Sequence, residues 1–310
     1  MSSLPVSARA GHSELASAAP APLEDPRSGA RFWRLKSFAR DRGALVSGLF
    51  LLAVVLAVLF APLIAHYGPD EADNLARYKP IGTPGHILGT DQQGRDMLAR
   101  LLFGGRVSLL VGVVPTLVAG AIGLGLGLTA GFVRGLVDQI IMRCLDVVFA
   151  FPMVLLAIAI AGSMRPGVLT EILAITIVLI PYFARLARTA TEGVTPMPFI
   201  EAARAAGGAP MTIMVRYVLP NVFSPVVVYA TTLMGLMIVV GSGLSFLGLG
   251  VQPPGASLGS LLRQGSAYLT FAPWLALSSG LVLSSAIMSV NLVGDAIRDV
   301  LEPLHGRPLT

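Results

Sequence analysis

The stretch VSLLVGVVPTLVAGAIGLGLGLTAGFV, residues 107–133, carries no charged side chain between Arg106 and Arg134. A helix needs about 20 apolar residues to cross the hydrocarbon core of a bilayer. This stretch is longer than that, and it consists of aliphatic residues, Gly and Ala. We therefore expect a membrane-spanning helix here.

The composition of the whole chain points the same way. Of the 310 residues, 54% are hydrophobic and only 13% are charged. Soluble domains carry about 25% charged residues, so this chain has too few charges to cover a soluble surface. The net charge of +5 comes from basic residues spread along the chain, which does not favour nucleic-acid binding. The single cysteine, Cys144, excludes an intrachain disulfide.

Charge-poor intervals predict an all-α membrane protein with six transmembrane helices. The first interval follows a basic stretch and is too long for a secretory signal, so we expect it to stay in the membrane. The intervals that we expect to span are 43–66, 106–134, 146–165, 168–184, 221–247 and 273–294.

The distribution of Arg and Lys orients these helices. The excess of positive charge lies on the side that holds both chain ends, which the positive-inside rule assigns to the cytoplasm. We expect residues 1–42 to form a basic, disordered cytoplasmic tail and 298–310 a second cytoplasmic tail. Residues 67–105 form an external segment, and 106–297 form a five-helix core that includes a cytoplasmic loop at 185–220.

Three glycines within the opening stretch recur at four-residue spacing. Gly123, Gly127 and Gly131 share one helix face, where small residues let two helix backbones approach closely. A phosphate-binding loop is disfavoured because no strand precedes the GLGLG run.

The most informative loop reads TPMPFIEAARAAGGAPMTIMVRYVLPN, residues 195–221. We expect a helix capped by Thr195, with Pro196 near its first position, and a turn at Gly207 and Gly208. Pro210 then opens a second helix. A compact helix with one carboxylate fits a groove on another protein, but an ordinary helical hairpin is equally compatible with these residues.

A family resemblance favours the first of these interpretations. The residues Glu201, Ala202, Ala203 and Gly207, followed by Leu219 and Pro220, resemble the EAA loop of binding-protein-dependent ATP-binding-cassette importers. The resemblance implies that this loop holds a coupling helix, which seats in a cleft of a cytoplasmic ATPase. Close members of the family have His where this chain has Tyr217.

Further motifs narrow the resemblance. HILGTDQQGRDMLAR, residues 86–100, LSFLGLGVQPP, residues 244–254, and the stretch 138–152 are similar to the second permease subunit of dipeptide and oligopeptide importers. The resemblance covers about residues 35–303. It implies a type I importer permease of the bacterial plasma (inner) membrane.

The same resemblance implies a set of partners. These are a second permease subunit, cytoplasmic ATPase subunits and an extracytoplasmic substrate-binding protein. ATP and Mg would be used by the ATPases, so we expect no cofactor or metal bound by this chain. The substrate stays open among dipeptides, longer peptides, glutathione and nickel complexes.

Four charged residues of the external segment allow two interpretations. Asp91, Arg95, Asp96 and Arg100 could contact the termini of a peptide substrate. They could instead pair with one another, hold a turn and cap the next helix, which is the arrangement that we expect.

Two other classes of function are disfavoured. A stand-alone secondary transporter or channel would need ionisable residues at mid-bilayer, and Glu171 lies near one end of its predicted span. An intramembrane enzyme would need paired acids or a base beside a serine, and the predicted spans have neither. The chain also lacks a Gly-x-x-x-x-Gly-Lys-Ser/Thr phosphate loop, so we expect it not to hydrolyse ATP.

Overall fold

The computed structural model describes residues 49–301 except 51, 54, 55 and 59. These residues are mostly helical. Within the part of the chain that the structure describes, β structure is limited to two isolated bridges. The elements are α3 (Ala61–Ile64), η1 (Asn74–Ala76), α4 (Met97–Val133), α5 (Gly135–Phe149), α6 (Met153–Ser163), α7 (Val168–Val194), α8 (Pro198–Ala205), α9 (Pro210–Ile213), η2 (Met214–Val218), α10 (Leu219–Phe246), α11 (Leu258–Ser266) and α12 (Pro273–Leu301).

Within the described residues, four helical segments are long and apolar enough to cross a membrane. They are Met97–Val133, Val168–Val194, Pro210–Phe246 and Pro273–Asp295. A fifth span exists if α5 and α6, which meet at an 82° bend, are counted together. The all-α membrane fold is therefore confirmed. The count of six is not fully confirmed, because much of the first predicted span, 43–66, lies outside the described residues.

The third predicted span is interrupted. We expected one helix between Asp146 and Arg165, but α5 ends at Phe149 and α6 begins only at Met153. Pro152 is the N-cap of α6, and a proline disfavours helical geometry in the residue before it. The two helices consequently meet at the bend.

Two acidic side chains of α5 form ion pairs with arginines of α7. The Arg188 guanidinium of α7 binds Asp138 of α5, with Nε 2.5 Å from Oδ1. Arg185 of α7 binds Asp146 at 2.7 Å, and its guanidinium carbon lies 3.7 Å from the centroid of the Phe149 ring. These contacts hold α5 against α7.

The first long helix begins earlier than the charge pattern predicted. Residues 97–105, expected in the external segment, are the first turns of α4. Asp96 caps this helix, because its Oδ2 accepts a hydrogen bond from the Ala99 amide at 2.8 Å. A charge-free interval underestimates the length of such a helix, because the terminal turns of the helix carry charged residues.

The core forms where α4 packs along α7, between the other helices. Buried residues of both helices, including Ala119 of α4 and Phe183 of α7, belong to this core. As the spacing predicted, Gly123, Gly127 and Gly131 face α7: a Cβ atom at any of them would crowd atoms of that helix. Close backbone packing of this kind holds helices together in lipid.

A matched pair of substitutions tests this contact. Gly127→Leu would drive a side chain into the carbonyl oxygen of Ala184, whereas the Cβ position of Gly125 has no atom within 4 Å. We expect Gly127→Leu to lower the free energy of unfolding by about 1–3 kcal/mol or more. Thermal unfolding of the purified protein in detergent measures this, with Gly125→Leu as control. Equal losses in the two variants would contradict the packing.

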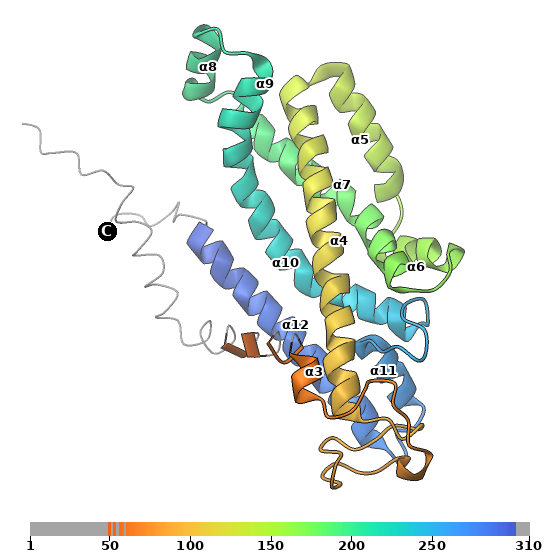
Figure 1. Cartoon of the computed structure of the whole chain (residues 1–310). Helices are drawn as coiled ribbons and strands as arrows, with labels where there is room; N and C mark the ends of the chain where they lie inside the picture. The colour runs from red at the N-terminus through yellow and green to blue at the C-terminus, as the bar shows by residue number, and fades with distance from the viewer. Residues whose placement is uncertain (1–48, 51, 54–55, 59, 302–310) are drawn as a thin grey trace, which may run out of the picture.

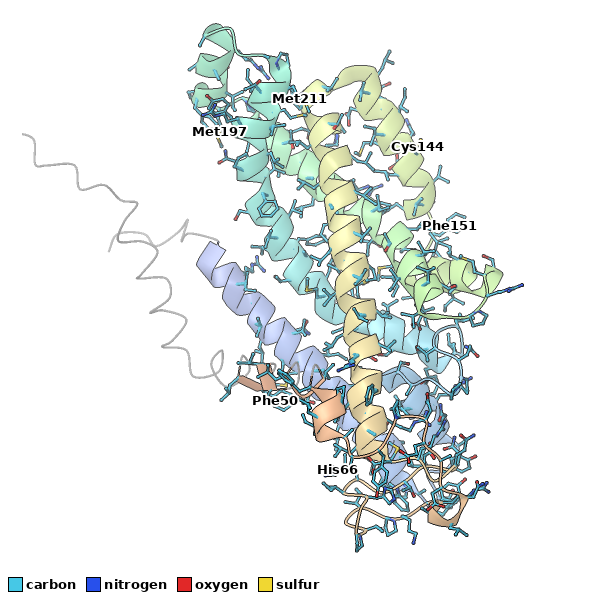
Figure 2. The ribbon with its side chains drawn as sticks, viewed as in Figure 1. Phe50, His66, Cys144, Phe151, Met197 and Met211 are labelled. Atoms are coloured by element: carbon cyan, nitrogen blue, oxygen red, sulfur yellow. The ribbon has the colours of Figure 1, made fainter. Side chains whose placement is uncertain are left out.

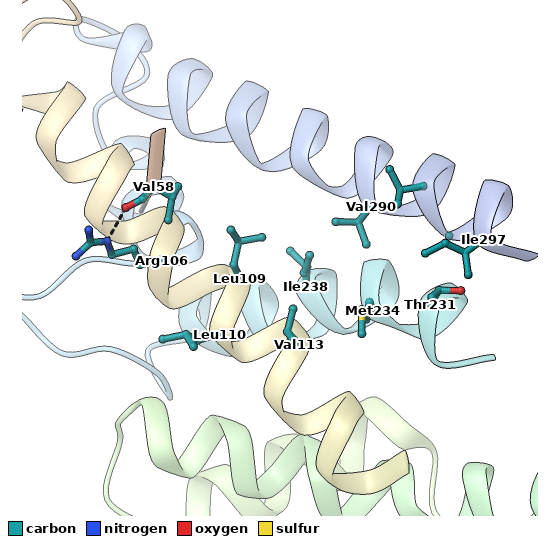
Figure 3. Close-up of a pocket in the computed structure, with 12 residues that line it drawn as sticks. Val58, Arg106, Leu109, Leu110, Val113, Thr231, Met234, Ile238, Val290 and Ile297 are labelled. Atoms are coloured by element: carbon teal, nitrogen blue, oxygen red, sulfur yellow. Dashed lines mark hydrogen bonds between the residues drawn. The ribbon is translucent and has the colours of Figure 1, made fainter. Parts of the chain in front are cut away.

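The two ends of the molecule differ. Figure 1 shows α8 and α9 at one end and the segment that precedes α4, together with α11, at the opposite end. In Figure 2, Met197 and Met211 mark the first end and His66 lies near the second. The predicted coupling loop and the predicted external segment are thus separated by the length of the spans.

Candidate coupling site

The loop begins differently from the sequence prediction. Thr195 does not cap α8; it ends α7, where its hydroxyl donates a hydrogen bond to the Thr191 carbonyl at 2.6 Å. A threonine hydroxyl can bond the carbonyl four residues earlier, which competes with its use as a cap. Met197 is the N-cap of α8, and Pro198 rather than Pro196 takes the first helical position.

The glycine turn has the predicted form. Gly207 has φ +77°, in the left-handed region that favours glycine. Its amide donates to the Arg204 carbonyl at 3.0 Å, and the Gly208 amide donates to the Ala203 carbonyl at 3.1 Å. These two bonds form a Schellman motif, which ends α8 and satisfies its last carbonyls.

The second half of the loop leads directly into a membrane span. Pro210 opens α9 as predicted, and α9, η2 and α10 follow without a break. The η2 segment is π-helical, and in it the Leu219 amide bonds the Met214 carbonyl. Pro220 has no amide proton to donate, and a local widening of the helix is one way to accommodate this. Residues Pro210–Phe246 therefore act as one continuous helical segment.

One face of α8 rests on its own chain. Ile200 is fully buried, Ala203 packs against the core cluster, and Ile213 of α9 is 2% exposed. The Arg204 guanidinium carbon lies 5.9 Å from the centroid of the Phe132 ring at the end of α4. These contacts fix α8 to the adjacent ends of the long helices.

The opposite face of α8 is free. Glu201 and Ala202 are exposed, and the Glu201 carboxylate bonds none of the described residues. Apolar side chains of Met197, Phe199 and Met211 are also exposed around it. Figure 2 shows Met197 and Met211 at this end of the molecule. A carboxylate amid exposed apolar side chains is a surface suited to a protein partner.

The four charged residues of the predicted external segment lie close together and are buried. Asp91 Oδ2 accepts hydrogen bonds from Arg95 Nε and from Arg100 Nη1, both at 2.7 Å. Asp96, the N-cap of α4, lies 3.0 Å from His86 Nδ1. Each of the four residues is at most 4% exposed. This geometry fits the interpretation in which they hold a turn and cap a helix.

Sequence reasoning missed a contributor from α11. Gln264 Oε1 lies 3.5 Å from Arg95 Nη2 and 3.4 Å from Arg100 Nη2. Nearby, the ring of Tyr78 packs edge-on against the ring of Tyr268. Burial raises the pKa of Tyr78, and the neighbouring Tyr268 phenol raises it further. Nothing in the local pattern marks Gln264, because its partners precede it by more than 160 residues.

The protein-family comparison matches more than half of the chain. Residues 123–305 match the family described as binding-protein-dependent transport system inner membrane component. The chain belongs to this family. It is thus a multi-pass membrane permease, and residues 29–80 also match the N-terminal transmembrane domain of oligopeptide transport permease C.

Curated relatives cover nearly the whole permease. A di/tripeptide transport system permease protein from Pseudomonas aeruginosa is 38% identical over 92% of this chain and 93% of its own length. A glutathione transport system permease protein from Escherichia coli O157:H7 is 40% identical over 88% of this chain and 89% of its own length.

Solved structures show the same fold. A chain of the MetNI methionine ABC transporter, in an inward-facing conformation, aligns with a TM-score of 0.56 and 21% identity. The alignment covers 66% of the permease and 97% of that chain. The permease therefore has the fold of an ABC importer membrane subunit.

Proposed function

We propose that the permease forms half of a translocation pathway and takes up the motion of ATPase subunits through α8. The observation that carries this proposal is the exposed Glu201 face of α8, backed by a buried face on the same helix. A partner that contacts the outer face can displace α8, and Ile200 passes that displacement to the core.

For ATP to drive transport, nucleotide binding by the ATPases must change the relative free energies of two conformations of the permease. Nucleotide binding shifts a conformational equilibrium only if the partner contacts the two conformations differently. A short rigid helix between α7 and the α9–α10 segment meets this requirement, because moving it moves both spans. ATP and Mg bind to the partner ATPases, a second permease completes the pathway, and a binding protein delivers substrate at the end opposite α8.

The proposed substrates are short peptides. The two curated relatives are named for di- and tripeptides and for glutathione, which is itself a tripeptide. Glutathione is the second candidate, because the Escherichia coli relative named for it is 40% identical to this chain.

Uptake by cells tests the substrate. A strain that lacks this permease should take up a labelled dipeptide slowly, and the intact gene should restore uptake. Excess unlabelled di- or tripeptide should compete with the label. Competition by glutathione alone, among peptides and a nickel complex offered at equal concentration, would select the second candidate. Uptake that no peptide affects would contradict the proposal.

A further inference from the structure

A buried carboxyl group lies at the end of α7 that is farthest from α8. Glu171, in the first turn of α7, is fully buried. Its Oε1 accepts a hydrogen bond from Ser245 Oγ of α10 at 2.6 Å, while Oε2 has no partner among the described residues. Burying a carboxyl group is costly without hydrogen bonds, so this contact strongly favours one arrangement of the two helices.

The polar contact continues into two further helices. Ser257 Oγ donates to Ser245 Oγ at 2.9 Å, and Ser257 also caps α11 through the Ser260 amide. The next amide, that of Leu258, donates to Ser108 Oγ of α4 at 3.0 Å. One chain of hydrogen bonds therefore links α7 and α10 to the start of α11, and α11 is in turn bonded to α4.

The backbone of the loop after α10 also contacts the start of α7 beside Glu171. The Gly167 amide, at the N-cap of α7, donates to the Leu249 carbonyl at 3.3 Å. Gly250 lies so close to the carboxyl group that a Cβ there would overlap both Glu171 Oε1 and Ser245 Oγ. The loop after α10 is thus seated on the beginning of α7.

As a result of these contacts, α7 and α10 are connected to each other at both of their ends. At the inner end, α7 and α10 are joined through α8 and α9. At the outer end they are joined by Glu171 and Ser245. Without the outer contact, a displacement of α8 could be absorbed by sliding of one long helix past the other.

We propose that Glu171 is a positioning residue that pins the outer ends of α7 and α10, so that displacement of α8 also moves α11 and the outer loop. This inference rests on the coupling role proposed for α8. Glu171 acts through its hydrogen bond with Ser245, and its carboxyl group occupies space that is open only because residue 250 is a glycine.

The test uses the assembled transporter in proteoliposomes, with its ATPases, second permease and binding protein. Ser245→Ala removes only the hydroxyl donor, and Gly250→Ala pushes a methyl group against the carboxyl group. We expect both variants to keep ATP hydrolysis but to transport about tenfold less substrate per ATP, because loss of one buried hydrogen bond shifts an equilibrium by about that factor. Gly162→Ala on α6, whose Cβ position has no atom within 4 Å, is the control.

A distance measurement separates pinning from a merely structural role. Spin labels at two exposed positions, Leu169 on α7 and Leu247 at the end of α10, report the outer contact directly. In the unmodified transporter their separation should stay the same with and without ATP. In Ser245→Ala the distance distribution should broaden.

The outcomes distinguish this inference from the proposed function. Unchanged transport per ATP in an assembled Ser245→Ala complex overturns the pin, even if Gly250→Ala fails to assemble. If Glu201→Ala uncouples the same transporter, the proposed function survives that result. If Glu201→Ala also leaves transport per ATP unchanged, the coupling role of α8 fails as well.

Discussion

Replacing Glu201 with Ala is expected to reduce substrate uptake at least about tenfold while the permease still reaches the membrane. The reason is that Glu201 is exposed and bonds none of the described residues, so its loss does not unfold the chain. Loss of a central contact at a protein interface weakens the interaction by about 2 kcal/mol or more. Uptake of a labelled peptide and ATP hydrolysis by the purified complex should be measured together.

The glycine turn should show a related effect with a different cause. Gly207→Val forces a β-branched residue into a left-handed conformation and disturbs the end of α8. We expect uptake to fall and ATP hydrolysis to lose its dependence on the binding protein. Gly193→Ala, near the end of α7 with no atom within 4 Å of its Cβ position, should behave normally. Normal uptake in both Glu201→Ala and Gly207→Val would contradict the coupling role.

The second large effect concerns stability at the end opposite α8. Asp91→Ala leaves the guanidinium groups of Arg95 and Arg100, which are 3% and 0% exposed, without their carboxylate. Breaking a buried ion pair by removing one partner costs about 3–5 kcal/mol. We therefore expect little folded permease and a sharply lowered unfolding temperature in detergent.

A comparison with an exposed acid makes this test specific. Asp70→Ala alters an exposed carboxylate of the same predicted external segment and should leave stability unchanged. If Asp91 instead served only to contact substrate, Asp91→Ala would fold normally and would change only the substrate concentration needed for half-maximal uptake. A stable Asp91→Ala variant would thus overturn the structural role that we assign to the cluster.

The helical membrane fold could be predicted because its signals are local. Runs of apolar residues predict spans, and the glycine spacing predicts the face on which α4 meets α7. The ends of the helices were harder to predict, because charges were taken as boundaries. Arg100 lies inside α4 and is paired with Asp91 of the preceding loop, whereas Asp138 lies inside α5 and is paired with Arg188, 50 residues later in the chain.

The site was predictable to a similar degree. The turn at Gly207 and the opening of α9 at Pro210 follow from residues that have few conformational alternatives. The role of Thr195 was predicted wrongly, because a hydroxyl near a helix end has two competing hydrogen-bond partners. The contact between Glu171 and Ser245 joins residues 74 positions apart, and no local pattern indicates it.

The most direct test of the central claim asks what touches the outer face of α8 in the assembled transporter. A photo-crosslinking amino acid at Ala202 should form a covalent adduct with an ATPase subunit, identified by mass spectrometry. The same probe at Leu169, which is 68% exposed at the end of α7 farthest from α8, should not crosslink to the ATPase. A complex that contains the ATPase, yet gives no ATPase adduct from Ala202, would contradict the claim that α8 couples ATP hydrolysis to transport.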